Sequence, residues 1–369
     1  MDKKVFTPTE RIVYALRSLY KRYGYTPYQM GKFEEYDLYS RNKDFLISDS
    51  VITFTDTNGK LKALKPDVTL SIIKNNRALN GRTEKLYYNE NVYRVSKGVG
   101  TFKEIMQAGI ECIGDVDSFA VGECLYLAAK SLLEIKEDFV LTVSSLDILL
   151  GFVGSVTEDR AVQDEIIRCV SEKNLHEIHT ICEKNGIDVE RAQPLEELVS
   201  IYGKICDVID RIALLCERQG VVEPMDDLRR ALSIFGGSPL SEKVVIDFSV
   251  VSDRNYYNGI IFKGFVEGVP GSVLSGGQYD KLMRRMHRRS NAVGFAVYLD
   301  MLERVDEEYD PYDVDVLLLY DEDTDPARLR DEMERCINQG ESVRSLKADD
   351  KKLRYRRLIN YHSRRDTDE

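Results

Sequence analysis

Apolar positions along the chain recur with two different spacings, and the change between them predicts a mixture of helices and strands. The first helix is predicted to follow Thr7, which can cap it, with Pro8 at its first position and Glu10 completing a capping box. Apolar residues then recur at helical spacing until Gly24 ends the pattern. Residues 23–39, YGYTPYQMGKFEEYDLY, follow as a predicted extended segment.

Strand patterns dominate the next part of the chain. Residues 51–66, VITFTDTNGKLKALKP, alternate on both sides of Asn58-Gly59, which predicts a β-hairpin. Antiparallel hairpins mixed with helices, without repeated βαβ units, predict an α+β fold around an antiparallel sheet. Further helices are predicted over 67–79 and 118–135, and strands over 85–94, 101–114, 139–145, 243–250, 258–265 and 271–277, after which residues 292–305 close the unit.

Two parts of the chain depart from this mixed pattern. Residues from about 155 to 235 are charge-rich and helical throughout, with no strand pattern, which predicts a helical insertion. After residue 309, a new strand at 314–320 precedes a helix that is capped at Asp325 and ended by Gly340, and a basic polar tail follows. We therefore predict a core of residues 1–309 and a small C-terminal α/β module of residues 310–369.

The composition argues against several classes of partner and site. The chain has 63 acidic and 52 basic residues and a net charge of −11, which weighs against nucleic acid as the main partner. The sequence has no signal-peptide pattern and no apolar run long enough to span a bilayer, so we expect a cytoplasmic protein that does not bind membranes. The seven cysteines have no CxxC pair and are expected to be free buried thiols. Four histidines, at positions 176, 179, 287 and 362, lack metal-ligand neighbours, so we expect neither a metal nor a cofactor.

Polar side chains interrupt the apolar strands at several positions. Gln107 and Glu111 lie four residues apart on one predicted strand, so their side chains share a face. Either this face is solvated, or Glu111 pairs with a neighbouring Lys or Arg, or the side chains line a pocket for a small, partly cationic ligand. The other polar groups on or beside apolar strands are Asp67, Arg94, Tyr256 and Tyr257.

Two further segments are ambiguous. Gly276-Gly277, just before Gln278-Tyr279, can mark a bulge or twist in a strand, or a close approach of the backbone to a ligand. The basic run RRMHRR at 284–289 can be a solvated helix end or a phosphate-binding segment.

Six segments occur in the order and spacing of the catalytic core of class II histidyl-tRNA synthetases, which the chain resembles over about residues 5–305. They are ALKPDVT, KLYYNENVYR, EIMQAGIECIG, NYYNGIIF, LSGGQYD and AVGFAVYLDML. The resemblance implies a class II aminoacyl-tRNA synthetase-like fold, with an antiparallel sheet of about six to seven strands flanked by helices. It also implies a homodimer that forms through residues 23–38.

The chain departs from these synthetases where they carry charge for catalysis. In the family's Arg-x-Glu motif, Arg94 is present but Ser96 replaces the Glu. The resemblance also implies three arginines that are replaced here, by Ser252, Gln278 and Met301. Adenylate formation needs cations around the α-phosphate, so these losses argue against it.

The amino-acid pocket of the family is better retained. The resemblance implies eight histidine-binding residues: Asp67, Thr69, Arg94, Gln107, Glu111, Tyr256, Tyr257 and Tyr279. Of these, Asp67 and Thr69 would take the α-amino group, while Glu111 and Tyr257 would receive the imidazole. A ligand without imidazole would leave these buried groups unpaired, so it would be strongly rejected.

A histidine pocket without adenylation machinery, on an acidic chain, most resembles a paralogous family, the regulatory subunits of ATP phosphoribosyltransferase. This resemblance implies a non-catalytic subunit that joins a short catalytic subunit in a hetero-oligomer, activates it and makes it sensitive to feedback by histidine. Residues 311–369 agree, because they are shorter than the complete anticodon-binding domain of a synthetase. Two alternatives stay open: an active histidyl-tRNA synthetase, and a synthetase-derived module that senses histidine in another complex.

Overall fold

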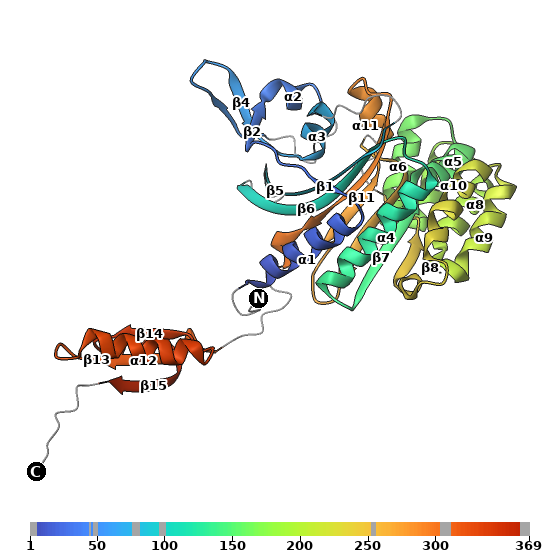
Figure 1. Ribbon diagram of the computed structural model, residues 1–369. Helices are drawn as coiled ribbons and strands as arrows, with labels where there is room; N and C mark the ends of the chain where they lie inside the picture. The colour runs from blue at the N-terminus through green and yellow to red at the C-terminus, as the bar shows by residue number, and fades with distance from the viewer. Residues whose placement is uncertain are drawn as a thin grey trace, which may run out of the picture. The chain divides into compact units, whose positions relative to one another are not determined.

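The computed structural model describes residues 6–43, 46, 51–75, 82–95, 101–251, 256–302 and 311–361. The chain divides into two compact units, residues 1–306 and 307–369. The larger unit is organised around a nine-stranded sheet (Figure 1). Its strands, in spatial order, are β1 (Thr26–Pro27), β5 (Glu84–Val95), β6 (Phe102–Gly114), β12 (Asn291–Tyr298), β11 (Leu274–Gln278), β10 (Asn258–Val266), β7 (Phe139–Ser145), β9 (Val244–Asp247) and β8 (Tyr202–Lys204).

The sheet confirms the predicted α+β class and is wider than the resemblance implied. Its pairings are antiparallel except for β1 with β5 and β7 with β9. The short strands β1 and β8 lie at its two edges. The prediction of a wholly helical region over 155–235 is wrong at β8, because Tyr202–Lys204 pairs antiparallel with β9 and so joins the main sheet. This pairing is a tertiary contact that a single-segment pattern does not reveal.

One face of the sheet is covered by helices α1 (Pro8–Arg22) and α4 (Ser118–Ile135). Helix α1 begins with the predicted capping box: the Glu10 backbone N–H donates to Thr7 Oγ1 at 3.2 Å, and the Thr7 N–H donates to Glu10 Oε2 at 2.9 Å. Gly24 ends the helix as expected, with a φ of +80° that favours glycine.

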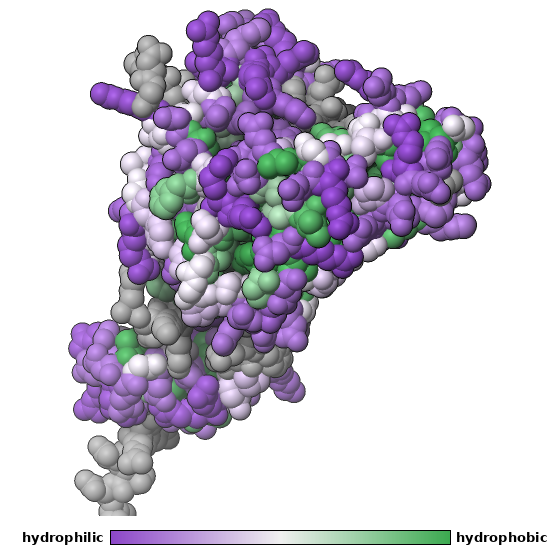
Figure 2. Space-filling view, turned by 90° about the vertical axis from the view of Figure 1, so that its right-hand side faces the viewer, coloured by the Kyte–Doolittle hydropathy of each residue, from purple (hydrophilic) through white to green (hydrophobic). Residues whose placement is uncertain are grey.

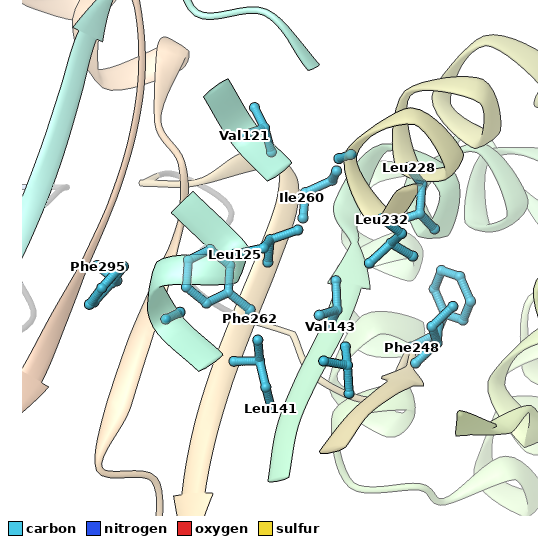
Figure 3. Packing of buried hydrophobic residues seen from close by; sticks show 14 of the residues in the cluster. Val121, Leu125, Leu141, Val143, Leu228, Leu232, Phe248, Ile260, Phe262 and Phe295 are labelled. Carbon is cyan, nitrogen blue, oxygen red and sulfur yellow. The ribbon is translucent and has the colours of Figure 1, made fainter. Parts of the chain in front are cut away.

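The main core lies between these helices and the sheet. Figure 3 shows side chains of α4, such as Leu125, packed over strands β7 and β10, which contribute Leu141 and Phe262. All three side chains are fully buried. The rings of Phe262 and Phe295 meet edge to face, with centroids 6.2 Å apart. Gly264 lets α4 approach β10 closely, since a Cβ there would lie 2.7 Å from the methyl groups of Leu132.

The opposite face of the sheet carries a second, smaller core. Helix α3 (Thr69–Asn75) lies here, with α2 (Tyr36–Ser40) and a small antiparallel sheet of β2 (Phe33–Glu35), β4 (Leu61–Leu64) and β3 (Thr53–Thr55). Their buried residues pack against Tyr88 and Ile113 of the main sheet. The two cores therefore use opposite faces of the same strands.

One local prediction on this side is confirmed, and another needs correction. The hairpin of β3 and β4 is present, but its loop spans residues 56–60, and of the Asn58-Gly59 pair only Gly59 has a positive φ. The Asp56 carboxylate shapes the loop by accepting the backbone N–H groups of Asn58 and Lys60. The extended segment predicted at 23–39 is wrong at its end, because residues 36–40 form α2, whose Tyr39 is fully buried.

The insertion after β7 is a bundle of amphipathic helices. It contains α5 (Leu146–Val156), α6 (Arg160–Ser171), α7 (Leu175–Lys184), α8 (Gln193–Ser200), α9 (Ile205–Arg218) and α10 (Val222–Leu232). Their buried sides join the main core, where Leu228 and Leu232 of α10 appear beside β7 (Figure 3). The face of the molecule in Figure 2 is mostly hydrophilic with smaller apolar patches, as expected of helices that bury one side.

The second unit is a small module with parallel strands. Strand β13 (Val314–Tyr320) lies between β14 (Val343–Leu346) and β15 (Tyr355–Tyr361), and both neighbours are parallel to it. Helix α12 (Pro326–Asn338) begins as predicted, with the Asp325 carboxylate accepting the Ala327 N–H at 2.9 Å. The expected polar tail is wrong over β14 and β15, because arginines interrupt the apolar residues of both strands and obscure the strand pattern. No helix among the described residues is long and apolar enough to cross a membrane.

Candidate ligand-binding site

A cavity of about 400 Å³ opens on the face of the main sheet opposite α1 and α4. It lies within the size range of small-molecule sites. Strands β5, β6, β12, β11 and β10 contribute to it, together with the start of α3 and the residues that flank α11 (Asp280–Arg285). All eight residues predicted from the sequence line this cavity: Asp67, Thr69, Arg94, Gln107, Glu111, Tyr256, Tyr257 and Tyr279.

Glu111 is the central carboxylate of the cavity. Its side chain is buried, with Oε1 accepting from Thr69 Oγ1 at 2.8 Å and Oε2 accepting from the Tyr279 hydroxyl at 2.5 Å. No Lys or Arg of the described residues forms an ion pair with it, so neither the solvated face nor the cationic partner considered from the sequence applies. Burial raises the pKa of Glu111 to about 8, against the lowering effect of the two hydroxyl donors. The carboxyl therefore holds a proton near neutral pH and is prepared for a basic partner.

Two glycines make room for the side chains that form the cavity. A Cβ on Gly294 of β12 would lie 1.9 Å from Glu111 Oε2, so the Glu111 carboxylate extends across the neighbouring strand. A Cβ on Gly277 of β11 would lie 2.9 Å from the ring of Tyr257. Gly276 and Gly277 thus permit close approach of neighbouring protein groups rather than of a ligand, and the register shift lies on β10 between Asn258 and Ile261.

Asp67 and Arg94 form the rim where α3 begins. Asp67 Oδ1 accepts the Leu70 N–H at 2.9 Å, and Oδ2 lies 3.8 Å from a guanidinium nitrogen of Arg94. Arg94 is held by its Nε, which donates to the Pro66 carbonyl at 2.7 Å. Burial raises the pKa of Asp67 above its usual value, although Arg94 and the backbone N–H groups act in the opposite direction. Arg94 therefore positions a second carboxylate that faces the same cavity.

Three tyrosines form an aromatic wall. The ring centroids of Tyr256 and Tyr257 are 4.5 Å apart, and those of Tyr256 and Tyr279 are 6.1 Å apart. Burial raises the pKa of each phenol well above its ordinary value, so all three stay protonated and can donate hydrogen bonds.

Gln107 supplies a polar atom that nothing in the described structure satisfies. Its side chain is buried in the cavity wall, yet Nε2 has no hydrogen-bond partner among the described residues. An unpaired buried donor costs free energy, about 1–3 kcal/mol in typical cases. Such a group in a cavity is expected where a ligand supplies the acceptor.

Sequence reasoning missed four polar residues of the cavity, on four different strands: Tyr88, Lys263, Ser275 and Tyr298. The signal for Lys263 was a charged residue inside the apolar strand pattern NGIIFKGF. Ser275 and Tyr298 share a hydrogen bond of 2.6 Å between their hydroxyls, although they are far apart in sequence. Only the pairing of β11 with β12 brings them together.

Two of the positions where the resemblance implied arginine have structural roles here. Gln278 Oε1 accepts the backbone N–H of Ile260 at 2.8 Å, beside the register shift of β10. Met301 packs against the main core. The other positions at which catalytic charge was expected, Ser96 and Ser252, lie outside the described residues.

No ligand-binding role is assigned to the remaining candidate segments, the basic run and the cysteines. The basic run at 284–289 includes the end of α11, and Arg288 donates to the Lys74 carbonyl at 3.1 Å. The seven cysteines are free, and Cys206 is exposed, contrary to the expectation of burial. Among the described residues, no cluster of His, Cys, Asp and Glu is arranged to hold a metal ion.

Comparison with known proteins identifies the family and the fold of the chain. A family model described as histidyl-tRNA synthetase matches residues 3–302. An ATP phosphoribosyltransferase regulatory subunit from Thermoanaerobacter sp. is 32% identical over 292 residues, which are 77% of this chain and 75% of that protein.

Two solved structures share the fold. One is described as an ATP phosphoribosyltransferase regulatory subunit/histidyl-tRNA synthetase from Bacillus halodurans, with a TM-score of 0.76, 22% identity and coverage of 96% of this chain and 94% of that one. A chain of the ATP phosphoribosyl transferase complex from Thermotoga maritima has a TM-score of 0.60 and 19% identity, and the match covers 78% of this chain and 96% of that one. The chain thus has the histidyl-tRNA synthetase fold and belongs to the family of ATP phosphoribosyltransferase regulatory subunits.

Proposed function

We propose that this chain is a non-catalytic subunit that assembles with a phosphoribosyltransferase catalytic chain, and that free histidine in the cavity controls the assembly. Family membership supports the regulatory role over an active synthetase. The observation that carries the ligand assignment is Glu111: a buried carboxyl that holds its proton near neutral pH, oriented by two hydroxyl donors and lacking a cation among the described residues. An imidazole is a basic, uncharged partner that such a group can bind.

In this proposal the imidazole ring lies beside Glu111 and Tyr257. The ordinary pKa of an imidazole is about 6.5, close enough to that of Glu111 for the two groups to share one proton in a strong hydrogen bond. Tyr257 bonds the other ring nitrogen, and the rings of Tyr256 and Tyr279 enclose the ligand. Amino acids without imidazole leave the Glu111 proton without an acceptor and are rejected, at a cost of about 2 kcal/mol or more.

The α-amino group of the ligand belongs at the rim. Asp67 is a buried carboxylate with one oxygen facing Arg94, and Thr69 lies between Asp67 and Glu111 in the lining of the cavity. An ammonium group there supplies the positive charge that would lower the raised pKa of Asp67. Gln107 and Arg94 lie near the same α-groups.

Control of the catalytic partner requires that histidine bind two states of the complex unequally. A coupling of about 1–3 kcal/mol is typical of such effects. The chain is proposed to form a homodimer through residues 23–38 within the hetero-oligomer. Phe33 of β2 is exposed there and packs edge to face on Phe54 of β3, with centroids 5.4 Å apart. The acidic net charge of −11 speaks against nucleic acid as a further partner.

The test combines this chain with a short ATP phosphoribosyltransferase catalytic chain. We expect the two to co-purify, the catalytic chain to gain activity, and histidine to inhibit the complex. Glu111→Gln should weaken histidine binding at least tenfold by calorimetry and should shift inhibition to correspondingly higher histidine concentrations. The matched control is Glu104→Gln, on the same strand but exposed outside the cavity, where it accepts from Asn91 and Tyr93.

Two outcomes contradict the proposal. If the chains neither associate nor change activity, the regulatory role is wrong. If Glu111→Gln and Glu104→Gln bind histidine equally well, the assignment of the cavity to histidine is wrong.

A further inference from the structure

One end of the cavity is not used by the contacts proposed for the amino group and the imidazole. This end is formed by Lys263 on β10, Ser275 on β11 and Tyr298 on β12. The strand register places Lys263 directly opposite Ser275, and the hydroxyls of Ser275 and Tyr298 are bonded to each other. Hydrogen-bond donors therefore gather where these three strands line the cavity.

The Lys263 ammonium group has no counter-charge in the described structure. It is half-buried, and neither an ion pair nor a hydrogen bond to a described residue holds it. Burial lowers its pKa, with no carboxylate acting in the opposite direction. A partly desolvated charge without a partner is unfavourable, and an apolar side chain would fill the same position on the strand at lower cost.

Gln107 is a second unsatisfied donor in the same cavity. Its Nε2 is buried and has no partner among the described residues. Gln107 lies opposite Tyr298 in the pairing of β6 with β12, so Tyr298 stands between it and Ser275. Two donors without acceptors indicate that the ligand itself brings an anionic group to this end.

The spacing suits an amino acid whose two ends reach both parts of the cavity. The Glu111 carboxylate lies over Gly294 of β12. Lys263 is two strands away and two residues along, a backbone separation of about 12 Å at ordinary strand spacing. The length of the Lys263 side chain shortens this distance. An amino acid that makes one hydrogen bond to Lys263 and another to Glu111 can therefore span the rest of it.

We propose that Lys263 binds the α-carboxylate of the amino acid in this cavity, with Gln107 as the second donor. This inference rests on the proposed function and adds to it: recognition requires a zwitterion, so the ligand must carry a free carboxylate as well as an imidazole. Histidine analogues whose carboxylate is absent or reduced should therefore not control the catalytic partner.

The test compares histidine with histamine, which has the imidazole and amine but no carboxylate. By calorimetry, wild type should bind histidine at least tenfold more tightly than histamine. Lys263→Met, which keeps the length of the side chain, should weaken histidine binding about 10- to 100-fold and change histamine binding less than twofold. Lys263→Arg should restore most of the histidine affinity. Lys130→Met, on α4 and outside the cavity, is the matched control for loss of a lysine.

Four results would overturn the inference. Equal histidine binding by Lys263→Met and wild type would remove the role of Lys263 while leaving the proposed function intact. Equal losses for histidine and histamine would show that Lys263 only supports the shape of the cavity. Inorganic phosphate that binds wild type as tightly as histidine, but not Lys263→Met, would assign Lys263 to a phosphate. Absence of any histidine binding by wild type would remove the proposed histidine site together with this inference.

Discussion

The two faces of the nine-stranded sheet are built from alternate residues of the same strands, yet they differ in polarity and in packing. On β10, Phe262 points into the helix-covered core, while its neighbour Lys263 lines the cavity. On β12, Phe295 joins the core, and Gly294 provides the floor beneath Glu111. The first face carries the main core and buries most of the apolar area, and the second combines the smaller core with polar groups that line the cavity.

The cavity face contains buried polar groups that lower the stability of the fold, which the helix-covered face does not. Glu111 and Asp67 are buried carboxyls whose pKa values are raised, and Gln107 retains an unsatisfied donor. Local departures of this kind from the rules of stable packing are expected at functional sites. The stability supplied by the main core on the helix-covered face therefore offsets the unfavourable burial of polar groups around the cavity.

The largest expected difference between the faces is in stability. Phe262→Ala removes a fully buried ring from the helix side and should lower the free energy of unfolding by about 3–5 kcal/mol. Ser275→Ala on the cavity side should cost less than about 1 kcal/mol, because it removes one hydroxyl at a partly exposed position. Urea unfolding measures both changes. Similar losses of unfolding free energy for the two variants would contradict the conclusion that the helix-covered face contributes more to stability.

A smaller effect should follow from adding one methyl group to the floor of the cavity. In Gly294→Ala the new Cβ would lie 1.9 Å from Glu111 Oε2 and 2.5 Å from the Ile110 carbonyl, so the carboxylate must move. We expect a loss of about 1–3 kcal/mol in stability and at least tenfold weaker histidine binding.

The matched control for this change is Gly154→Ala in helix α5. A Cβ there meets nothing within 4 Å, so alanine should leave histidine binding unchanged and stabilise the helix by about 0.5–1 kcal/mol. Thermal unfolding and calorimetry distinguish the two variants, and equal histidine affinity in both would show that the floor of the cavity tolerates the methyl group.

A further expected effect is a pH dependence that belongs only to the cavity face. The pKa of Glu111 is raised from 4.5 to about 8, so between these values the folded state binds more protons than the unfolded state. The stabilising contribution of the protonated carboxyl is therefore present below pH 4.5 and is lost as pH rises through 8. Glu111→Gln cannot ionise and should lack this decline.

Measured without ligand, the unfolding free energies of wild type and Glu111→Gln should diverge by about 2 kcal/mol between pH 6 and pH 8, with the variant gaining. Asp67 is present in both proteins, so its own titration largely cancels in the difference. Parallel pH profiles for the two proteins would mean that Glu111 is ionised throughout this range.

Part of the candidate site could be predicted because its residues stand out locally, and the rest, such as Thr69 and Tyr279, through the resemblance to histidyl-tRNA synthetases. Glu111 and Gln107 interrupt an apolar strand, and the eight predicted residues all line one cavity. Ser275 and Tyr298 were missed because each is unremarkable within its own segment, and Lys263 was missed although its charge interrupts an apolar strand. They become a cluster only through the pairing of β10, β11 and β12, which joins residues far apart in the chain.

The sequence alone determined the elements that depend on short-range chemistry. The capping box of α1, the full length of α4 and the strand β7 need only nearby residues and their periodicity, and the structure confirms their positions. Alternation along the strands also determined which side chains share a face, because successive residues point to opposite sides.

Only the tertiary structure decided what each face became. Whether Glu111 met water, a lysine or two hydroxyls depended on the placement of Thr69 and Tyr279, which are 42 and 168 residues away along the chain. The incorporation of β8 into the sheet and the gathering of donors around Lys263 depended likewise on strand order. These outcomes are set by long-range pairing and burial, whose energies no local segment contains.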